Sequence, residues 1–199
     1  MKKYIFIFIT FIVVKPIFAQ DIKNNNQLKF RNDFSIYYVQ NLSLDDNFIS
    51  DANKYKYGFG INFKALEYNN FKLGLGYELL KFKTVDFAKA GNIEKINLTN
   101  LNFKIYYPIE LPSNFILEPN VGLAILQLHQ KSENKNFGFI NGTGYNLGVD
   151  LNYKLTSNFR LLFGVNYMYG NYKVNTSKEF EKYFENSNQL LISLGIQIN

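Results

Sequence analysis

The sequence contains a single histidine, His129, and it is followed closely by Ser132 and Glu133. A serine, a histidine and a carboxylate are the minimal set for nucleophilic hydrolysis, because the histidine can accept the serine proton while the acid orients its ring. The alternative interpretation is a solvated histidine at the point where a strand meets its outer loop. Which of the two holds depends on the elements that position these residues.

Metal and cofactor chemistry has little support in the residue types. The chain has one histidine and no cysteine, and its carboxylates are scattered, so no ligand cluster of recognised spacing is present. Asp45, Asp46 and Asp51 could attract calcium or the cations that bridge lipopolysaccharide, but a solvated loop is the favoured interpretation. The glycines alternate within expected strands and form no phosphate-binding loop. We therefore expect no catalytic residue, no metal and no cofactor.

The first nineteen residues have the layout of a secretory signal peptide. Lys2 and Lys3 form a positive start, an apolar run follows from Ile5 to Val14, and Ala19 supplies a small residue at the expected cleavage site. The uncharged run is too short for a spanning helix, which needs roughly 20 apolar residues. Removing this segment lowers the formal charge from +6 to +3, a balance that does not indicate nucleic acid as a partner.

The rest of the chain alternates with a period of two residues, which predicts β-strands rather than helices. In residues 142–155, for example, large apolar side chains alternate with glycine and polar side chains. We expect strands at 28–40, 54–65, 71–82, 97–107, 115–127, 142–155, 159–169 and 189–199. Two of them are irregular, because Ile96 and Leu98 fall on the wrong face and Pro119 suggests a bulge.

The expected connections alternate in length. Short ones fall at 66–70, 108–114 and 156–158, whereas long ones fall at 41–53, 83–95, 129–141 and 171–188. Bacterial outer-membrane barrels have short periplasmic turns and long outer loops. The sequence therefore predicts an all-β fold: an eight-stranded antiparallel transmembrane β-barrel with an up-and-down meander. Its segments would be a signal peptide at 1–19, a short periplasmic segment at 20–27 and the barrel at 28–199, with both termini periplasmic.

Glycine placement decides which face should meet lipid. The glycines of the expected strands share a face with the charged residues, and the narrow interior of an eight-stranded barrel favours small side chains. The Leu, Ile, Phe and Tyr face is then the outside, which suits a bilayer better than the exterior of a soluble ligand carrier.

Aromatic side chains of the outward register gather at the strand ends. Two belts of this kind are typical of a wall that crosses two membrane interfaces. The expected periplasmic belt contains Phe63, Phe71, Tyr107, Phe115, Tyr153 and Phe159. The expected outer belt contains Tyr38, Tyr55, Tyr77, Tyr145, Tyr167 and Tyr169.

Strands such as YKYGFGINF, FKLGLGYEL and FILEPNVGLAI, with the closing LLISLGIQIN, give the chain a family resemblance. It resembles the small outer-membrane barrels of the OmpA/OmpX type, particularly the stand-alone barrels of Bacteroidetes. The resemblance implies a Gram-negative cell envelope and insertion by the outer-membrane assembly machinery, although many members end in an aromatic residue and this chain ends in Asn199. Barrel lipid A deacylases, which this chain would otherwise resemble at His129, carry serine two residues after the histidine; here that residue is Lys131.

The inward register also carries charge. The expected lumen network consists of Asp33, Lys64, Lys72, Lys104, Glu118, Asp150, Lys154 and Arg160. Closing the 108–114 turn with Tyr107 opposite Phe115 would place Lys104 opposite Glu118, and Lys154 would oppose Arg160. Glu118 would then serve both sites, and a polar plug is favoured over an anion-preferring pore.

These observations predict an integral outer-membrane protein with a structural or surface-interaction role and a plugged interior. A narrow anion-preferring solute channel is the alternative, and a lipid A-modifying barrel enzyme is the third option. Expected partners are outer-membrane lipid and lipopolysaccharide, together with an extracellular partner that the sequence does not identify. The chain is expected to be a monomer.

Overall fold

The structure is a computed structural model that describes residues 28–90, 92–132, 135–175 and 177–199. The expected signal peptide at 1–19, the segment at 20–27 and Glu133 lie outside these ranges.

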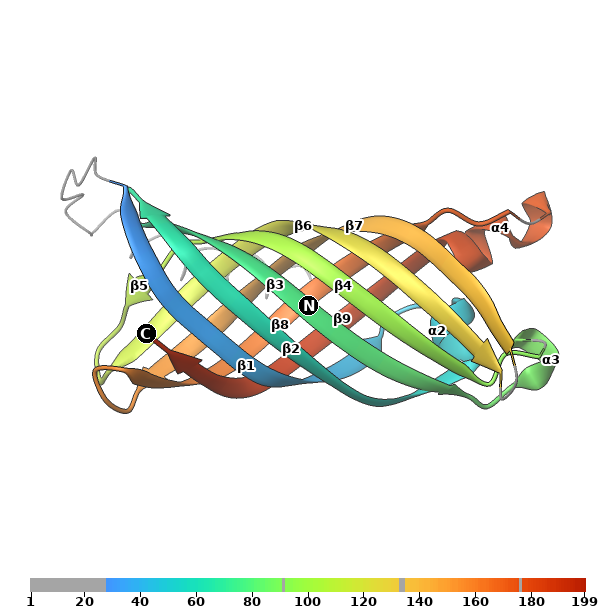
Figure 1. Ribbon diagram of the computed structural model, residues 1–199, viewed down its shortest axis with the longest axis horizontal. Helices are drawn as coiled ribbons and strands as arrows, with labels where there is room; N and C mark the ends of the chain where they lie inside the picture. The colour runs from blue at the N-terminus through green and yellow to red at the C-terminus, as the bar shows by residue number, and fades with distance from the viewer. Residues whose placement is uncertain (1–27, 91, 133–134, 176) are drawn as a thin grey trace, which may run out of the picture.

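Eight long strands form a closed antiparallel barrel (Figure 1). Each long strand pairs with its neighbours in sequence, and β1 closes the barrel on β9, which confirms the expected up-and-down meander. A ninth, two-residue strand, β5 (Ile109–Glu110), pairs with β6 alone. The long strands are β1 (Lys29–Ser43), β2 (Asn53–Tyr68), β3 (Phe71–Thr84), β4 (Lys95–Tyr106), β6 (Phe115–Ser132), β7 (Lys135–Lys154), β8 (Phe159–Tyr172) and β9 (Asn186–Ile198).

The two ends of the barrel differ (Figure 1). At the end called here the turn end, the connections are short, and β1 begins and β9 finishes there. At the opposite loop end lie three helices, α2 (Phe48–Asp51), α3 (Phe87–Ala90) and α4 (Lys178–Glu185).

The turn between β2 and β3 is the tightest connection. Tyr68 pairs with Phe71, and the two intervening residues, Asn69 and Asn70, have φ angles of 48° and 67°. Positive φ at both central residues is the geometry of a type I′ hairpin turn, whose twist matches that of the flanking strands. Asparagine tolerates this conformation better than other residues with a Cβ, so the Asn-Asn pair fixes the register of the hairpin.

The prediction of a long connection at 129–141 was wrong. Strand β6 continues to Ser132 and β7 begins at Lys135, with His129 paired to Phe139 and Leu128 to Ile140. The sequence there is mostly polar and lacks clear alternation. A ladder needs only backbone hydrogen bonds, so a hairpin that rises above the apolar band can carry polar side chains on both faces.

The two strands that were expected to be irregular are regular in the structure at Ile96, Leu98 and Pro119. Strand β4 pairs without a register shift on both sides, and Ile96 and Leu98 point inward, fully buried. Pro119 also sits in a continuous ladder with β7, opposite Val149. The Pro119 carbonyl accepts a hydrogen bond from the Tyr107 amide, at the point where the chain leaves β4. The N–H that proline lacks would point to the same side of the strand. No bulge is needed there.

The outer wall carries a band of exposed apolar side chains. Leu123, for example, is 71% exposed, and large apolar residues on all eight long strands are exposed in the same outward register. A protein with this surface would be insoluble in water, whereas the surface suits the hydrocarbon of a bilayer. Among the described residues, no helix is long and apolar enough to cross a membrane.

Candidate functional site

The interior of the barrel is packed with side chains, and glycines make room for the largest of them. The Tyr37 ring lies against Gly60 so closely that a Cβ at that position would overlap the ring. Gly74 accommodates the ring of Tyr106 in the same way. These two inward glycines are therefore positions where a large neighbour occupies the lumen, as expected for a narrow barrel.

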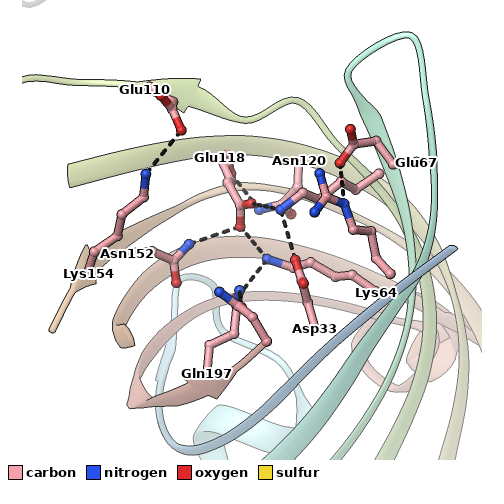
Figure 2. A network of polar contacts seen from close by, with 12 residues as sticks. Asp33, Lys64, Glu67, Glu110, Glu118, Asn120, Asn152, Lys154 and Gln197 are labelled. Atoms are coloured by element: carbon pink, nitrogen blue, oxygen red, sulfur yellow. Dashed lines mark hydrogen bonds and ion pairs between the residues drawn. The ribbon is translucent and has the colours of Figure 1, made fainter. Parts of the chain in front are cut away.

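Glu118 lies at the centre of an ion-pair network in the half of the lumen next to the turn end (Figure 2). One carboxylate oxygen accepts from Lys64 Nζ, and the other accepts from Lys72 Nζ at 3.1 Å. Asn152 donates at 2.9 Å to the same Glu118 oxygen as Lys64, and Lys72 also donates to Asp33 at 2.9 Å. The side chains of Lys64 and Glu118 are fully buried, so these charges balance one another away from water.

Two further polar groups lie deeper in the barrel. Glu78 accepts from the Tyr37 hydroxyl at 3.0 Å and from Asn100 at 2.8 Å. Asn166 joins a lysine to an acid: its amide oxygen accepts from Lys104 Nζ at 3.1 Å and its amide nitrogen donates to Asp150 at 3.3 Å.

The buried charges of the lumen nearly cancel. The buried cationic side chains among the described residues are Lys64, Lys72 and Lys104, and the buried anionic ones are Asp33, Glu78, Glu118 and Asp150. Such a set does not present a surplus of positive charge to a permeating anion. Mutual pairing instead holds strands together across the lumen.

The expected partner of Glu118 was wrong. Lys104 lies opposite Gly122, not opposite Glu118. The hairpin closes two residues later than assumed, because the chain keeps its register past Pro108 and turns at 111–114. Glu118 therefore reaches across the lumen to Lys64 on β2 and Lys72 on β3, contacts that hairpin counting does not reach.

Lys154 and Arg160 do oppose each other in register, but they lie at the turn-end mouth rather than inside. Lys154 donates to the exposed Glu110 at 3.1 Å, and Glu118 serves neither of the two. Arg160 lines a polar hollow of about 440 Å³ at this mouth, together with Arg31 and Glu67, which form their own pair at 2.8 Å.

The other half of the lumen is mainly apolar, although Ser187 and Gln189 are also buried there, and the alternation along the chain did not predict this. Its inner face carries residues such as Leu80, Leu98 and Leu128, which are in register across β3, β4 and β6. Met168 and Leu191 add to the same cluster from β8 and β9. The buried ion pairs of the lumen therefore lie in the half next to the turn end. The reason is that interior positions need volume and water exclusion, which apolar side chains supply as well as ion pairs.

Helix α2 closes the loop end of the barrel. Phe48 and Ile49 are buried in the apolar cluster, and Phe48 packs against Phe184 of α4 with ring centroids 5.3 Å apart. Asn47 caps the helix through its side chain, with Ser50 returning a bond to the Asn47 amide. In mid-lumen the void lined by Tyr37, Glu78, Lys104 and Asp150 measures about 10 Å³, which is the size of roughly one water.

Most residues of the two expected aromatic belts lie on the outer surface. Phe71 packs on Tyr107 with centroids 5.2 Å apart and Phe115 on Tyr153 at 4.9 Å. The most exposed members are Phe63, Phe71, Phe159, Tyr38, Tyr77 and Tyr145, and Tyr107, Phe115, Tyr167 and Tyr169 are partly covered by neighbours.

Tyr55 departs from its expected outward place. A bulge between Tyr55 and Tyr57 shifts the register of β2 against β3, so Tyr55 pairs with Phe82 and packs against the apolar cluster of the lumen. Its hydroxyl donates to the Val39 carbonyl. Counting by twos fails across such a bulge, because one extra residue exchanges the two faces.

The residues that suggested hydrolysis or cation binding are used elsewhere. His129 packs against Phe139 with centroids 4.4 Å apart, and Ser132 lies 3.5 Å from Glu94. Asp45 accepts from the amide and the side chain of Asn188, so it ties the first loop to β9. Asp51 pairs with Lys89 instead, and among the described residues no three candidate metal ligands lie together.

Sequence reasoning missed Glu78, Tyr37 and Tyr106. Glu78 had a signal, because it continues the inward register of Gly74 and Gly76. Tyr106 was obscured because Tyr107, its neighbour, fits the outward pattern equally well. Its ring instead lies in the lumen, where Lys64 Nζ sits 4.4 Å from its centroid.

Comparison with solved structures identifies the architecture. Neisserial surface protein A matches with a TM-score of 0.57 and 19% identity over 86% of this chain and 98% of that one. The chain has the fold of a small outer-membrane barrel. A major outer membrane protein from Thermus thermophilus matches with a TM-score of 0.51 and 15% identity, over 84% of this chain and 99% of that one.

A third match is Ail, the attachment invasion locus protein of Yersinia pestis, in complex with the heparin analogue sucrose octasulfate. Its TM-score is 0.51 and its identity 16%, over 84% of this chain and 98% of that one. These matches bear out the expected likeness to small barrels of the OmpA/OmpX type. No protein-family model matches the chain, and no curated protein matches it.

Proposed function

We propose that the protein is a monomeric integral outer-membrane protein whose closed barrel holds its loop end at the cell surface in a structural or surface-interaction role. The observation that carries this proposal is the combination of an exposed apolar wall with a filled interior. The wall is suited to lipid, and the mid-lumen void between the described side chains has room for roughly one water.

Orientation follows from the two ends of the barrel. The turn end, with the short connections and both strand termini, faces the periplasm, and the end that carries α2, α3 and α4 faces outward. The long strands contain 12 to 20 residues, whereas a tilted strand needs roughly 9–11 to cross the hydrocarbon. The surplus length extends the barrel beyond the lipid and supplies a surface for contact with lipopolysaccharide or an extracellular partner.

Membrane fractionation with surface proteolysis tests the location. The mature chain should co-fractionate with outer membrane and should migrate faster on unheated than on heated detergent gels. Proteases added to whole cells should cut near 173–178 and leave the barrel strands intact. Recovery as a soluble periplasmic monomer would overturn the proposal.

Arginine substitution tests which face meets lipid. Leu75→Arg, in the middle of the outward face, should cost about 2–4 kcal/mol of unfolding free energy, the range for a basic residue at the bilayer midplane. Asn141→Arg, outward but near the loop end, should cost about 0–1 kcal/mol, as near an interface. Denaturant unfolding from lipid vesicles measures both, and equal costs would contradict a lipid-facing wall.

Planar-bilayer recording separates an anchoring role from the anion-preferring channel. We expect no steady conductance from the folded protein, because paired charges fill one half of the lumen and apolar side chains fill the other. A reproducible anion-selective current would favour the channel instead. Lipid A mass spectra with and without the protein should be identical, and a changed acyl pattern would favour the enzyme.

A further inference from the structure

Four lysines stand side by side on the outer wall near the loop end. Lys54 on β2 pairs with Lys83 on β3, which pairs with Lys95 on β4, which pairs with Lys131 on β6. This set is called here the lysine row. Neighbouring strands lie about 4.8 Å apart, so the row extends for roughly 14 Å along the rim.

Two more lysines extend the row toward the apolar band. Lys81 donates to the Tyr57 hydroxyl at 3.1 Å, with its Nζ 5.1 Å from the ring centroid. Lys56 projects outward beside the bulge of β2. Both line a surface hollow of about 490 Å³ together with Lys83, Lys95 and Lys131. Five lysine side chains therefore contribute to the lining of this one hollow.

This arrangement is unfavourable without a ligand, because like charges directly opposite on neighbouring strands repel each other. Among the described residues, none of these six lysines forms an ion pair with a carboxylate; the ion pairs present use other cations. The loop-end halves of β1, β8 and β9 carry no counterpart, since they contain no lysine. The charge is thus concentrated on one side of the rim.

The height of the hollow relates it to a lipid interface. On β3 the outward residues Leu75, Tyr77 and Leu79 are followed by Lys81 and then Lys83. Each outward step is roughly 7 Å along a tilted strand, and the polar interface of a bilayer extends roughly 5–8 Å beyond the hydrocarbon. Lysine side chains here reach the phosphate level while their stems lie along apolar surface.

We propose that the lysine row and its hollow bind the phosphate groups of an anionic glycolipid in the outer leaflet. A lipid satisfies both parts of the surface at once, because its phosphates meet the ammonium groups while its acyl chains cover the band around Leu75 and Leu79. A soluble polyanion would satisfy only the first part. This inference rests on the proposed outward orientation of the loop end.

The test measures binding of diphosphoryl lipid A to the purified, refolded full-length barrel in detergent, by native mass spectrometry. Lys83→Gln/Lys95→Gln removes the centre of the row. Each lysine near an anionic surface contributes roughly fivefold, so the double variant should bind about 25-fold more weakly. The matched control, Lys173→Gln/Lys178→Gln, removes two exposed loop-end lysines outside the row and should bind as the parent does.

Competing ligands decide between sources of the anion. Dephosphorylated lipid A should bind no better to the parent than to the double variant, and a sulfated polysaccharide should not displace diphosphoryl lipid A. Displacement by the polysaccharide would overturn the choice of a lipid. Equal lipid A binding by parent, double variant and control would overturn the site itself.

Folding and location are read separately. The double variant should keep its heat-modifiable migration and its outer-membrane fractionation, since the substituted side chains are exposed. Loss of lipid A binding with both intact supports the site. Failure of the parent to fractionate with the outer membrane would contradict the proposed function instead, whatever the binding result.

Discussion

The two halves of the lumen solve one packing problem with different chemistry. Next to the turn end, Glu118, Lys64 and Lys72 fill the barrel as an ion-pair network. Toward the loop end, Leu98 and Leu126 fill it as an ordinary apolar core capped by α2. Both halves exclude water, but only the first depends on specific partners.

This difference has an energetic consequence. Burying a charged side chain costs free energy because the charge loses its water. Its ion-pair partner offsets that cost only while the geometry of the pair is kept. Removing one member of the polar half therefore leaves its partners without a counter-charge. An apolar side chain leaves only a cavity when it is shortened, and neighbours relax partly into the space. The polar half should be the less tolerant of single substitutions.

The largest expected effect comes from Glu118→Gln. It leaves Lys64 and Lys72 without their shared carboxylate and should lower the unfolding free energy by about 3–5 kcal/mol, the usual cost of breaking a buried ion pair. Urea unfolding from lipid vesicles, followed by tryptic protection, measures it. Lys64→Gln should cost less, because Glu118 keeps Lys72 at 3.1 Å. The reverse order would contradict the central place of Glu118.

Leu126→Ala tests the apolar half. Leu126 is fully buried, and its truncation should cost about 2–5 kcal/mol, as for other buried leucines. The control is Leu123→Ala on the same strand, which faces outward. Its cost should be clearly smaller, since lipid tails can fill the space of the lost methyl groups. Equal losses in the two variants would mean that the loop-end half is not a packed core.

Glu110→Gln breaks an ion pair that lies outside the lumen, so it tests whether burial is what makes the lumen network sensitive to substitution. Its partner Lys154 lies at the turn-end mouth, with side chains 76% and 36% exposed for Glu110 and Lys154. An exposed pair contributes about 0–1 kcal/mol, so the variant should unfold close to the parent in the same urea assay. A loss as large as that of Glu118→Gln would show that burial is not what makes the lumen network sensitive.

The smallest effect concerns the contact between α2 and α3 at the loop end. The hydrogen bond from Lys89 to Asp51 and the negative charge of that carboxylate raise the pKa of Lys89 above its ordinary value of 10.5. A raised lysine pKa makes the contact fully present below pH 10.5 and lost as the pH rises through the higher folded-state value.

Spin labels on α2 and α3 should therefore report a fixed separation at neutral pH and a broader one in strong alkali. Lys89→Gln should give the broad distribution at neutral pH without changing the unfolding midpoint of the barrel. An unchanged distance in the variant would mean that the ion pair does not hold the two helices together.

Alternation along the chain was enough to predict the class of fold, the number of long strands and the face that is exposed on the outer wall. These properties are local, because side chains two residues apart on a strand share a face whatever the partner strand is. The placement of Leu75, Leu123 and Leu147 outside and of Lys64, Glu118 and Asp150 inside follows from this rule.

Only the tertiary structure decided which inward residues meet. The barrel closes, so Glu118 on β6 reaches Lys64 on β2, 54 positions away in sequence, and the register that sets this contact depends on where each hairpin turns. A shift of two residues at 111–114 moved Lys104 away from Glu118, and one extra residue near Tyr55 exchanged its face. The two-residue period of the sequence does not reveal such shifts. It indicates which side of a strand a residue occupies but not its height in the barrel.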